Sequence, residues 1–156
     1  MLLVTYNTLK KPHFQGWGKG FKVKGSSIRV YYDNLLQFVE NLAKEVIPED
    51  FSYSSGITRA GDSVVLTIRG PRLGEFDIFA SGVIVQIDYA GAYSATQVIG
   101  HGDEELPSYL CELVTDLVAF IVSDTPLLET KTFLRRRPRY EITLASDLYS
   151  LVLRKK

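Results

Sequence analysis

The sequence has few of the side chains that bind metal ions or form cross-links. Its 156 residues include one cysteine, Cys111, and two histidines, His13 and His101. A single cysteine excludes an intrachain disulfide and favours a reducing compartment, so we expect a cytoplasmic protein. Zinc needs several His or Cys ligands close together, and the two histidines are far apart in the sequence. We therefore expect no metal site and no cofactor.

Long apolar runs are also missing. No stretch of about 18 apolar residues occurs, so no membrane-spanning helix is expected. The first residues, 1–6, lack the basic and apolar regions of a signal peptide. Hydrophobic residues make up 46% of the chain, which excludes a disordered tail. We expect a single domain over residues 1–156, with a basic, Gly- and aromatic-rich arm at 10–27 and a basic segment at 131–156.

The motifs of common enzymes are absent or incomplete. Gly56–Ser63 has the glycine spacing of a phosphate-binding loop, but Asp62 stands where that loop needs its lysine. The segment also joins two expected strands, whereas a phosphate-binding loop joins a strand to a helix. No catalytic residue is therefore predicted.

Charge is abundant but divided into blocks. The net charge is zero, yet residues 1–32 carry six basic groups and no acid. Residues 33–130 carry four basic and sixteen acidic groups, and residues 131–156 carry eight basic and two acidic groups. Between Arg72 and Lys131 there are ten acids and no Lys or Arg. Such blocks affect association with partners more than they affect the fold.

Two helices are predicted from apolar residues at helical spacing. The first covers about 34–47, with Asp33 or Asn34 as its N-terminal cap and Pro48 after its end. The second covers about 106–123, with Pro107 in its first turn.

Residues 52–99 predict an antiparallel β-meander of about five strands, packed on one face by these helices, which defines an α+β fold. Turn residues separate short β-rich runs. With a turn at Ser81-Gly82, the register forms three apolar rows on one face. These rows are Ile68, Phe76, Ile87; Leu66, Ile78, Val85; and Val64, Ala80, Val83. The other face carries Thr67, Asp77, Gln86 in one row and Arg69, Glu75, Asp88 in another.

The remaining segments are less defined. Residues 124–138 are expected to form a loop. Tyr140, Ile142 and Leu144 alternate as in a strand, while 148–153 fits either a strand or a helix.

The acidic stretch supplies the candidate binding residues. Glu112 and Asp116 form a like-charge i,i+4 pair without basic relief in the helix, which costs a little stability. A surface that meets a cationic partner would have this composition. The predicted partner-binding residues are Asp103, Glu104, Glu105, Glu112, Asp116, Glu75, Asp77 and Asp88.

Three functions remain open on the sequence. The first is a non-enzymatic inhibitor or immunity-type domain that engages a basic protein, such as a nuclease or toxin, through this acidic face. The second is an accessory subunit that self-associates head to tail through its charge blocks. The third is an enzyme built on Arg69, Glu75, Asp77 and Asp88, which would need a pocket. The basic blocks at 135–139 and 154–156 match no nucleic-acid module, so nucleic-acid binding is not predicted.

Overall fold

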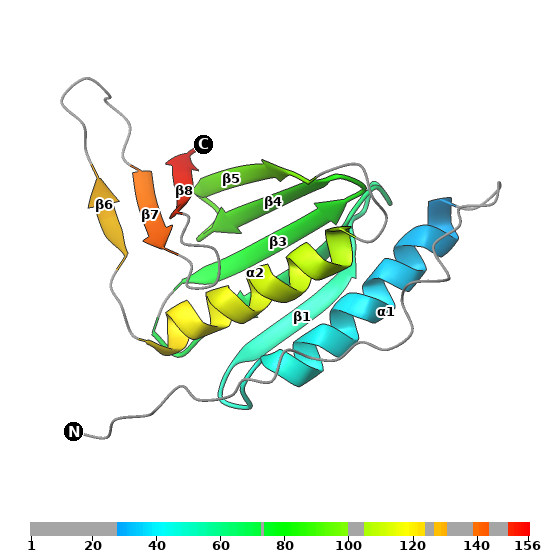
Figure 1. Ribbon diagram of the computed structural model, residues 1–156, viewed down its shortest axis with the longest axis horizontal. Helices are drawn as coiled ribbons and strands as arrows, with labels where there is room; N and C mark the ends of the chain where they lie inside the picture. Colours follow the sequence, from blue (N-terminus) through cyan, green and yellow to red (C-terminus); the bar gives the residue numbers. More distant parts are fainter. Residues whose placement is uncertain (1–27, 73, 100–104, 124–126, 131–138, 144–149) are drawn as a thin grey trace.

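The structure is a computed structural model that describes residues 28–156, except 73, 100–104, 124–126, 131–138 and 144–149. Within these residues, two helices lie on one face of an antiparallel sheet, which confirms the α+β class (Figure 1). The arm expected at 10–27 lies outside the described residues. The elements are α1 (Ile28–Val46), β1 (Ser52–Ile57), β2 (Val64–Arg69), β3 (Glu75–Ser81), β4 (Ile84–Tyr89), β5 (Tyr93–Val98), α2 (Glu105–Val122), β6 (Leu128–Thr130), β7 (Arg139–Thr143) and β8 (Ser150–Lys155).

The sheet contains the predicted five-strand meander and three further strands. Its order is β1-β2-β3-β4-β5-β8-β7-β6, so the last strand of the chain lies beside β5. The expectation of a loop over 124–138 was wrong at Leu128–Thr130, which pairs with β7 as β6. Residues 150–155 form a strand, which decides the ambiguous C-terminal segment. These short strands have little periodicity of their own, and pairing with a neighbouring strand defines them.

The predicted register is correct between β2 and β3 and wrong between β3 and β4. Ile68 faces Phe76 and Leu66 faces Ile78, as expected. In the next pair, however, Ile78 faces Ile87, Ala80 faces Val85, and Asp88 faces Asp77 where Glu75 was expected.

The cause of this shift is the turn. It consists of Gly82 and Val83, and Gly82 has a φ of 56°. A two-residue hairpin turn needs a positive φ at its first central position, which glycine adopts without strain and Ser81 would not. Val83 is therefore exposed in the turn, although it was expected to point inward. The pairing moves by two residues, so every other side chain keeps its expected face.

Helix α1 begins six residues earlier than predicted, at Ile28, so neither Asp33 nor Asn34 is its cap. Tyr31 packs against the core, and Leu35 and Phe38 are buried on the same stripe, at i,i+3 and i,i+4 spacing. Burying a large apolar side chain contributes about 1.5–3 kcal/mol, more than the ~1 kcal/mol of a typical N-cap. The packing therefore extends the helix past the capping signal. Its end before Pro48 is as predicted.

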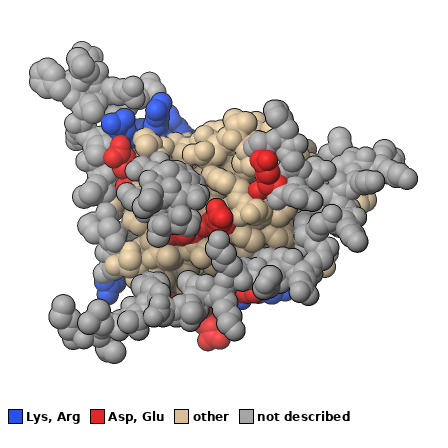
Figure 2. Space-filling model, viewed as in Figure 1, with Lys and Arg blue, Asp and Glu red and all other residues tan. Residues whose placement is uncertain are grey.

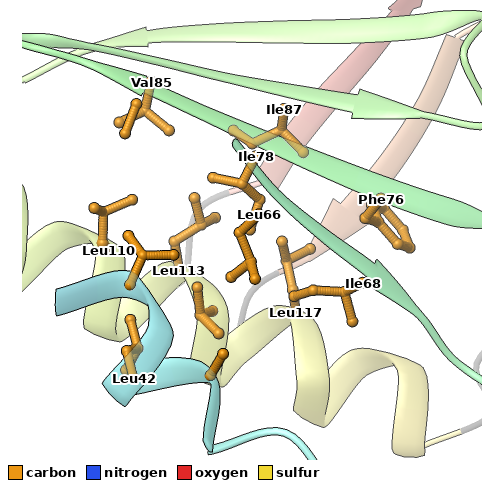
Figure 3. Packing of buried hydrophobic residues seen from close by; sticks show 14 of the residues in the cluster. Leu42, Leu66, Ile68, Phe76, Ile78, Val85, Ile87, Leu110, Leu113 and Leu117 are labelled. Atoms are coloured by element: carbon orange, nitrogen blue, oxygen red, sulfur yellow. The ribbon is translucent and has the colours of Figure 1, made fainter. Parts of the chain in front are cut away.

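The core lies between the helices and the expected apolar face of the sheet, which we call the helix face. Leu42 of α1 and Leu113 of α2 point toward Leu66 and Ile78 of the sheet (Figure 3). A cavity of about 10 Å³ remains between the two layers. Its lining is entirely apolar, so it offers no polar partner to hold a ligand or a water molecule. The lining residues are Val39, Leu42, Val64, Leu66, Ile78, Ala80, Leu110 and Val114.

An aromatic cluster joins the meander to the C-terminal strands. Only two residue pairs connect β5 with β8. On the helix face, the ring centroids of Tyr93 and Tyr140 are 4.5 Å apart, and those of Tyr89 and Tyr140 are 6.0 Å apart. Phe76 continues the cluster, 4.8 Å from Tyr89. Aromatic pairs of this kind contribute about 0.5–1.5 kcal/mol beyond area burial, so they supplement a short strand ladder.

Gly70 provides a test of the packing between α2 and the β2–β3 connection. A Cβ added at Gly70 would lie inside the contact distance of Ile121 Cγ2 and 3.5 Å from the Phe51 ring. We expect Gly70→Ala to lower the free energy of unfolding by about 1–3 kcal/mol, because overpacking forces the neighbours apart. The same change in an Ile121→Ala background should cost much less, as measured by urea denaturation.

Gly56→Ala is the matched control, since no heavy atom lies within 4 Å of a Cβ there. Equal costs for Gly70→Ala in both backgrounds would contradict the proposed contact.

Candidate functional site

One polar row crosses seven strands, from β1 to β7, on the face of the sheet away from the helices, which we call the second face. The register places one residue from each of these strands in the row. The members are Ser54, Thr67, Asp77, Asp88, Ser94, Arg154 and Arg139. Because the C-terminal strands return beside β5, acids of the meander and arginines of the last strands share this row.

Asp88 is the most buried member of the row, with a side chain only 7% exposed. Lys156 Nζ donates to its Oδ2 at 2.6 Å, and Gln86 Nε2 donates to its Oδ1 at 2.9 Å. Burial raises the pKa of the Asp88 carboxyl, but hydrogen bonds from Lys156, Gln86 and Ser94 outweigh burial. The net pKa therefore lies below the ordinary value of 3.8.

Three other carboxylates of the sheet, on Glu75, Asp77 and Glu141, are also paired. Arg69 lies 2.6 Å from Glu75, and Thr67 Oγ1 donates to Asp77 Oδ1 at 2.6 Å. Arg139 and Glu141 form a longer pair at 3.9 Å. General acid–base chemistry requires a carboxyl group within reach of a bound substrate. These carboxylates instead hold side chains of their own sheet, and the cavity described above lies on the helix face.

The five acids predicted in and just before α2 differ in how far a partner could reach them. Asp103 and Glu104 lie outside the described residues. Glu105 is exposed and Glu112 is partly exposed. Asp116 is only 8% exposed, so a partner could reach little of it. The predicted set therefore lies on two sides of the molecule, because α2 covers the helix face while Glu75, Asp77 and Asp88 belong to strands with these side chains on the second face.

Helix α1 adds an acid that the sequence reasoning missed. Burial, together with the charges of Glu45 and Glu112, raises the pKa of the Cys111 thiol to about 11. Glu45 belongs to α1 and Glu112 to α2, so carboxylates of both helices act on the same region. The i,i+3 and i,i+4 rules link residues within one helix and cannot relate acids on two helices. Only the packing of α1 beside α2 reveals this pair.

The acids of the described residues divide into two groups by their partners. Those on the sheet and its hairpin, which we call the paired acids, hydrogen-bond or form ion pairs: Asp62, Glu75, Asp77, Asp88 and Glu141. Asp116 of α2 also has an interaction partner, so it does not belong to the second group. The remaining acids of the helices and the α1–β1 connection, which we call the unpaired acids, make neither interaction with any described residue: Asp33, Glu40, Glu45, Glu49, Asp50, Glu105 and Glu112.

Basic side chains lie together on the last strands of the sheet, β7 and β8. Arg154 and Lys155 of β8 are exposed and follow Arg139 of β7 in the sheet. Figure 2, seen from the helix side, shows Lys and Arg near the end of the chain and in smaller spots along the lower edge, while Asp and Glu form separate spots between uncharged surface. Among the described residues, the last strands therefore carry mainly positive charge, and the helix side carries acids in separate places.

Other site classes find no support in the described residues. No group of three or more His, Cys, Asp or Glu side chains is placed to hold a metal ion in this part of the chain. Neither of the two described helices is long and apolar enough to span a membrane. Comparison with protein-family models, with curated proteins and with solved structures finds no match.

Asp88 generates a prediction on pH dependence. Its folded pKa is lowered, so the carboxylate stabilises the fold above its unfolded pKa and loses this contribution as pH falls through the folded value. We expect Asp88→Asn to lower the free energy of unfolding by about 1.5–3 kcal/mol at pH 7, the contribution of a hydrogen bond to a charged group. The difference from wild type should shrink as pH falls below 3.8. Urea denaturation across this range measures it.

Lys156→Met is the companion variant, because it removes the main donor to Asp88. If the two variants act through the same interaction, their combined effect is smaller than the sum of the separate effects. A difference between Asp88→Asn and wild type that stays constant with pH would contradict the assignment.

Proposed function

We propose that this chain is a non-enzymatic protein-binding domain that engages a basic partner through the unpaired acids of its helix layer. The observation that carries the proposal is the division of the acids by partner. The acids of the sheet and its hairpin hydrogen-bond or form ion pairs with neighbouring side chains, while Glu45, Glu105 and Glu112 make neither interaction with any described residue. Uncompensated charge of one sign costs stability and speeds association with an oppositely charged surface.

The finer proposal is that binding blocks the partner, as an inhibitor or immunity protein blocks a nuclease or toxin. A rigid two-layer domain suits this role because its interface backbone needs little rearrangement on binding. The buried core and the continuous sheet ladder hold α1 and α2 in fixed positions.

The test compares two variants with the same change in net charge. We expect Glu45→Gln/Glu105→Gln/Glu112→Gln to lose a Lys- and Arg-rich protein that the wild type captures from its source cells, by about tenfold or more. Raising salt from about 0.1 M to about 1 M should release the same protein, because the Debye length falls from about 10 Å to about 3 Å. Quantitative mass spectrometry of the captured proteins measures both effects.

The matched control is Asp62→Asn/Glu75→Gln/Glu141→Gln, which neutralises three paired acids. Capture by the control at wild-type levels would assign binding to the helix layer. Equal loss in both variants would mean that net charge alone governs capture, and equal retention would contradict the proposal. Asp116 is left unchanged, because a substitution at so buried a position would confuse unfolding with loss of binding.

The second candidate function is a subunit of a head-to-tail assembly. It is favoured by the exposed Arg154 and Lys155 on β8, which could meet the unpaired acids of a neighbouring copy. This predicts self-association that weakens with salt and is reduced in Arg154→Gln/Lys155→Gln, as measured by sedimentation velocity. A wild-type protein that stays monomeric at high concentration and low salt would eliminate this candidate.

A further inference from the structure

Within the part of the chain that the structure describes, strand β1 is an edge strand without the usual protection against further pairing. It stands at one end of the sheet, and no described strand pairs with its outer side. Its sequence, Ser-Tyr-Ser-Ser-Gly-Ile, contains no charge and no proline. The register with β2 is continuous from Ser52 to Ile57, so no bulge twists the edge away. Proteins normally protect such edges with charged side chains, proline, bulges or covering segments.

The hydrogen-bonding phase of β1 shows which backbone groups face outward. Just beyond the strand, Thr58 N donates to the opposite residue Ser63 O at 2.9 Å. Hydrogen-bonded and non-hydrogen-bonded pairs alternate along an antiparallel ladder. The residues whose N–H and C=O point away from β2 are therefore Tyr53, Ser55 and Ile57. Together they offer three donors and three acceptors to an added strand.

The side chains beside this edge are partly apolar. Tyr53 faces Ile68 in the register, so it lies on the helix face, where it stays 40% exposed. Ile57 has the same orientation and is half-buried. Helix α1 runs alongside β1 at this edge of the sheet (Figure 1). An added strand would thus find apolar contacts at alternate positions on the helix face.

The charge around the edge is negative. Glu49 and Asp50 are exposed just before β1, and Glu40 lies on the side of α1 opposite Glu45, which is the side away from α2. All three belong to the unpaired acids, and two nearby described cations oppose them: Lys44, one turn after Glu40 on α1, and Arg59, after β1. A strand that carries Lys or Arg would therefore be favoured over an acidic one.

We propose that the β1 edge binds an extended basic segment of the partner, which adds to the sheet as a ninth strand. This inference rests on the proposed function for the charge of the partner. Main-chain hydrogen bonds to Tyr53, Ser55 and Ile57 would supply affinity, and alternating apolar and basic side chains would supply specificity. A single strand needs about 4.8 Å of space beside β1. A second copy paired through β1 would place two α1 helices together on the same face, which favours a lone segment.

The test uses a synthetic peptide that alternates Lys and Val, with hydrogen exchange and NMR as readouts. In the free protein, the amides of Tyr53, Ser55 and Ile57 should exchange faster than those of Ser54 and Gly56, which bond to β2. We expect the peptide to protect these three amides selectively. A peptide N-methylated at the alternate residues whose N–H groups face β1 keeps its charge but cannot donate to β1. It should therefore bind at least about tenfold more weakly.

The protein variant is Ser55→Pro, which removes an outward N–H and leaves the ladder with β2 intact. It should weaken peptide binding while Ser55→Thr, which keeps the N–H, does not. Circular dichroism checks that both variants fold, and the N-methylated peptide tests the same point without any variant. Equal binding of the N-methylated peptide or of a Glu-Val peptide would overturn the proposal, as would no binding of the Lys-Val peptide.

Protection of all three amides in the free protein would also overturn the proposal, because the edge would already be occupied. Protection that persists on dilution would assign the edge to another segment of the same chain, and protection lost on dilution would assign it to a second copy.

The edge inference and the proposed function can fail independently of each other. If the helix-layer triple variant loses the host protein but the Lys-Val peptide does not bind, only the edge inference is wrong. If the triple variant retains that protein, the proposed function is wrong.

Discussion

The whole structure depends on the burial of one face of the sheet beneath two helices. Each strand alternates its side chains, so apolar residues such as Ile68 and Ile78 on the helix face place neighbours such as Thr67 and Asp77 on the second face. Burial of the first set fixes the register, the register aligns the polar row, and the helices that cover the core carry the unpaired acids. The candidate interaction surfaces are therefore consequences of the core.

The distribution of partners among the acids separates stabilising charges from charges available for binding. Asp88 is held by Lys156 from the last residues of the chain, so this pair joins β4 to the C-terminal segment and supplements the two-residue ladder between β5 and β8. Glu45 and Glu112 form no comparable pair, and their charges add to the effect of burial, which raises the pKa of the Cys111 thiol. Charges that the fold does not use are the better candidates for recognition.

The sequence predicted the meander well because its signals are local. Alternation identified β2 and β3, and the loop at 70–74 fixed their register. The prediction of the β3–β4 register was wrong because Gly82 can occupy either the first or the second position of a two-residue turn. Only the backbone shows that it occupies the first. The start of α1 failed because the gain from packing Tyr31 against the core is tertiary. The candidate site was predicted less well. Glu45 was missed although it is exposed, and Asp116 was predicted although it is buried, because helix packing decides the exposure of both residues.

By itself, the sequence determined the α+β class, the two helices, the faces of the central strands and the separation of charge into blocks, since each follows from the spacing of neighbouring residues. Tertiary structure alone decided that β8 returns beside β5, that Lys156 meets Asp88, that Glu45 of α1 acts on Cys111 of α2, and that β1 forms an edge of the sheet. These contacts join residues distant in the chain, and no local period encodes which distant surfaces meet. The core decides it, because one arrangement buries both helices and one face of the sheet together.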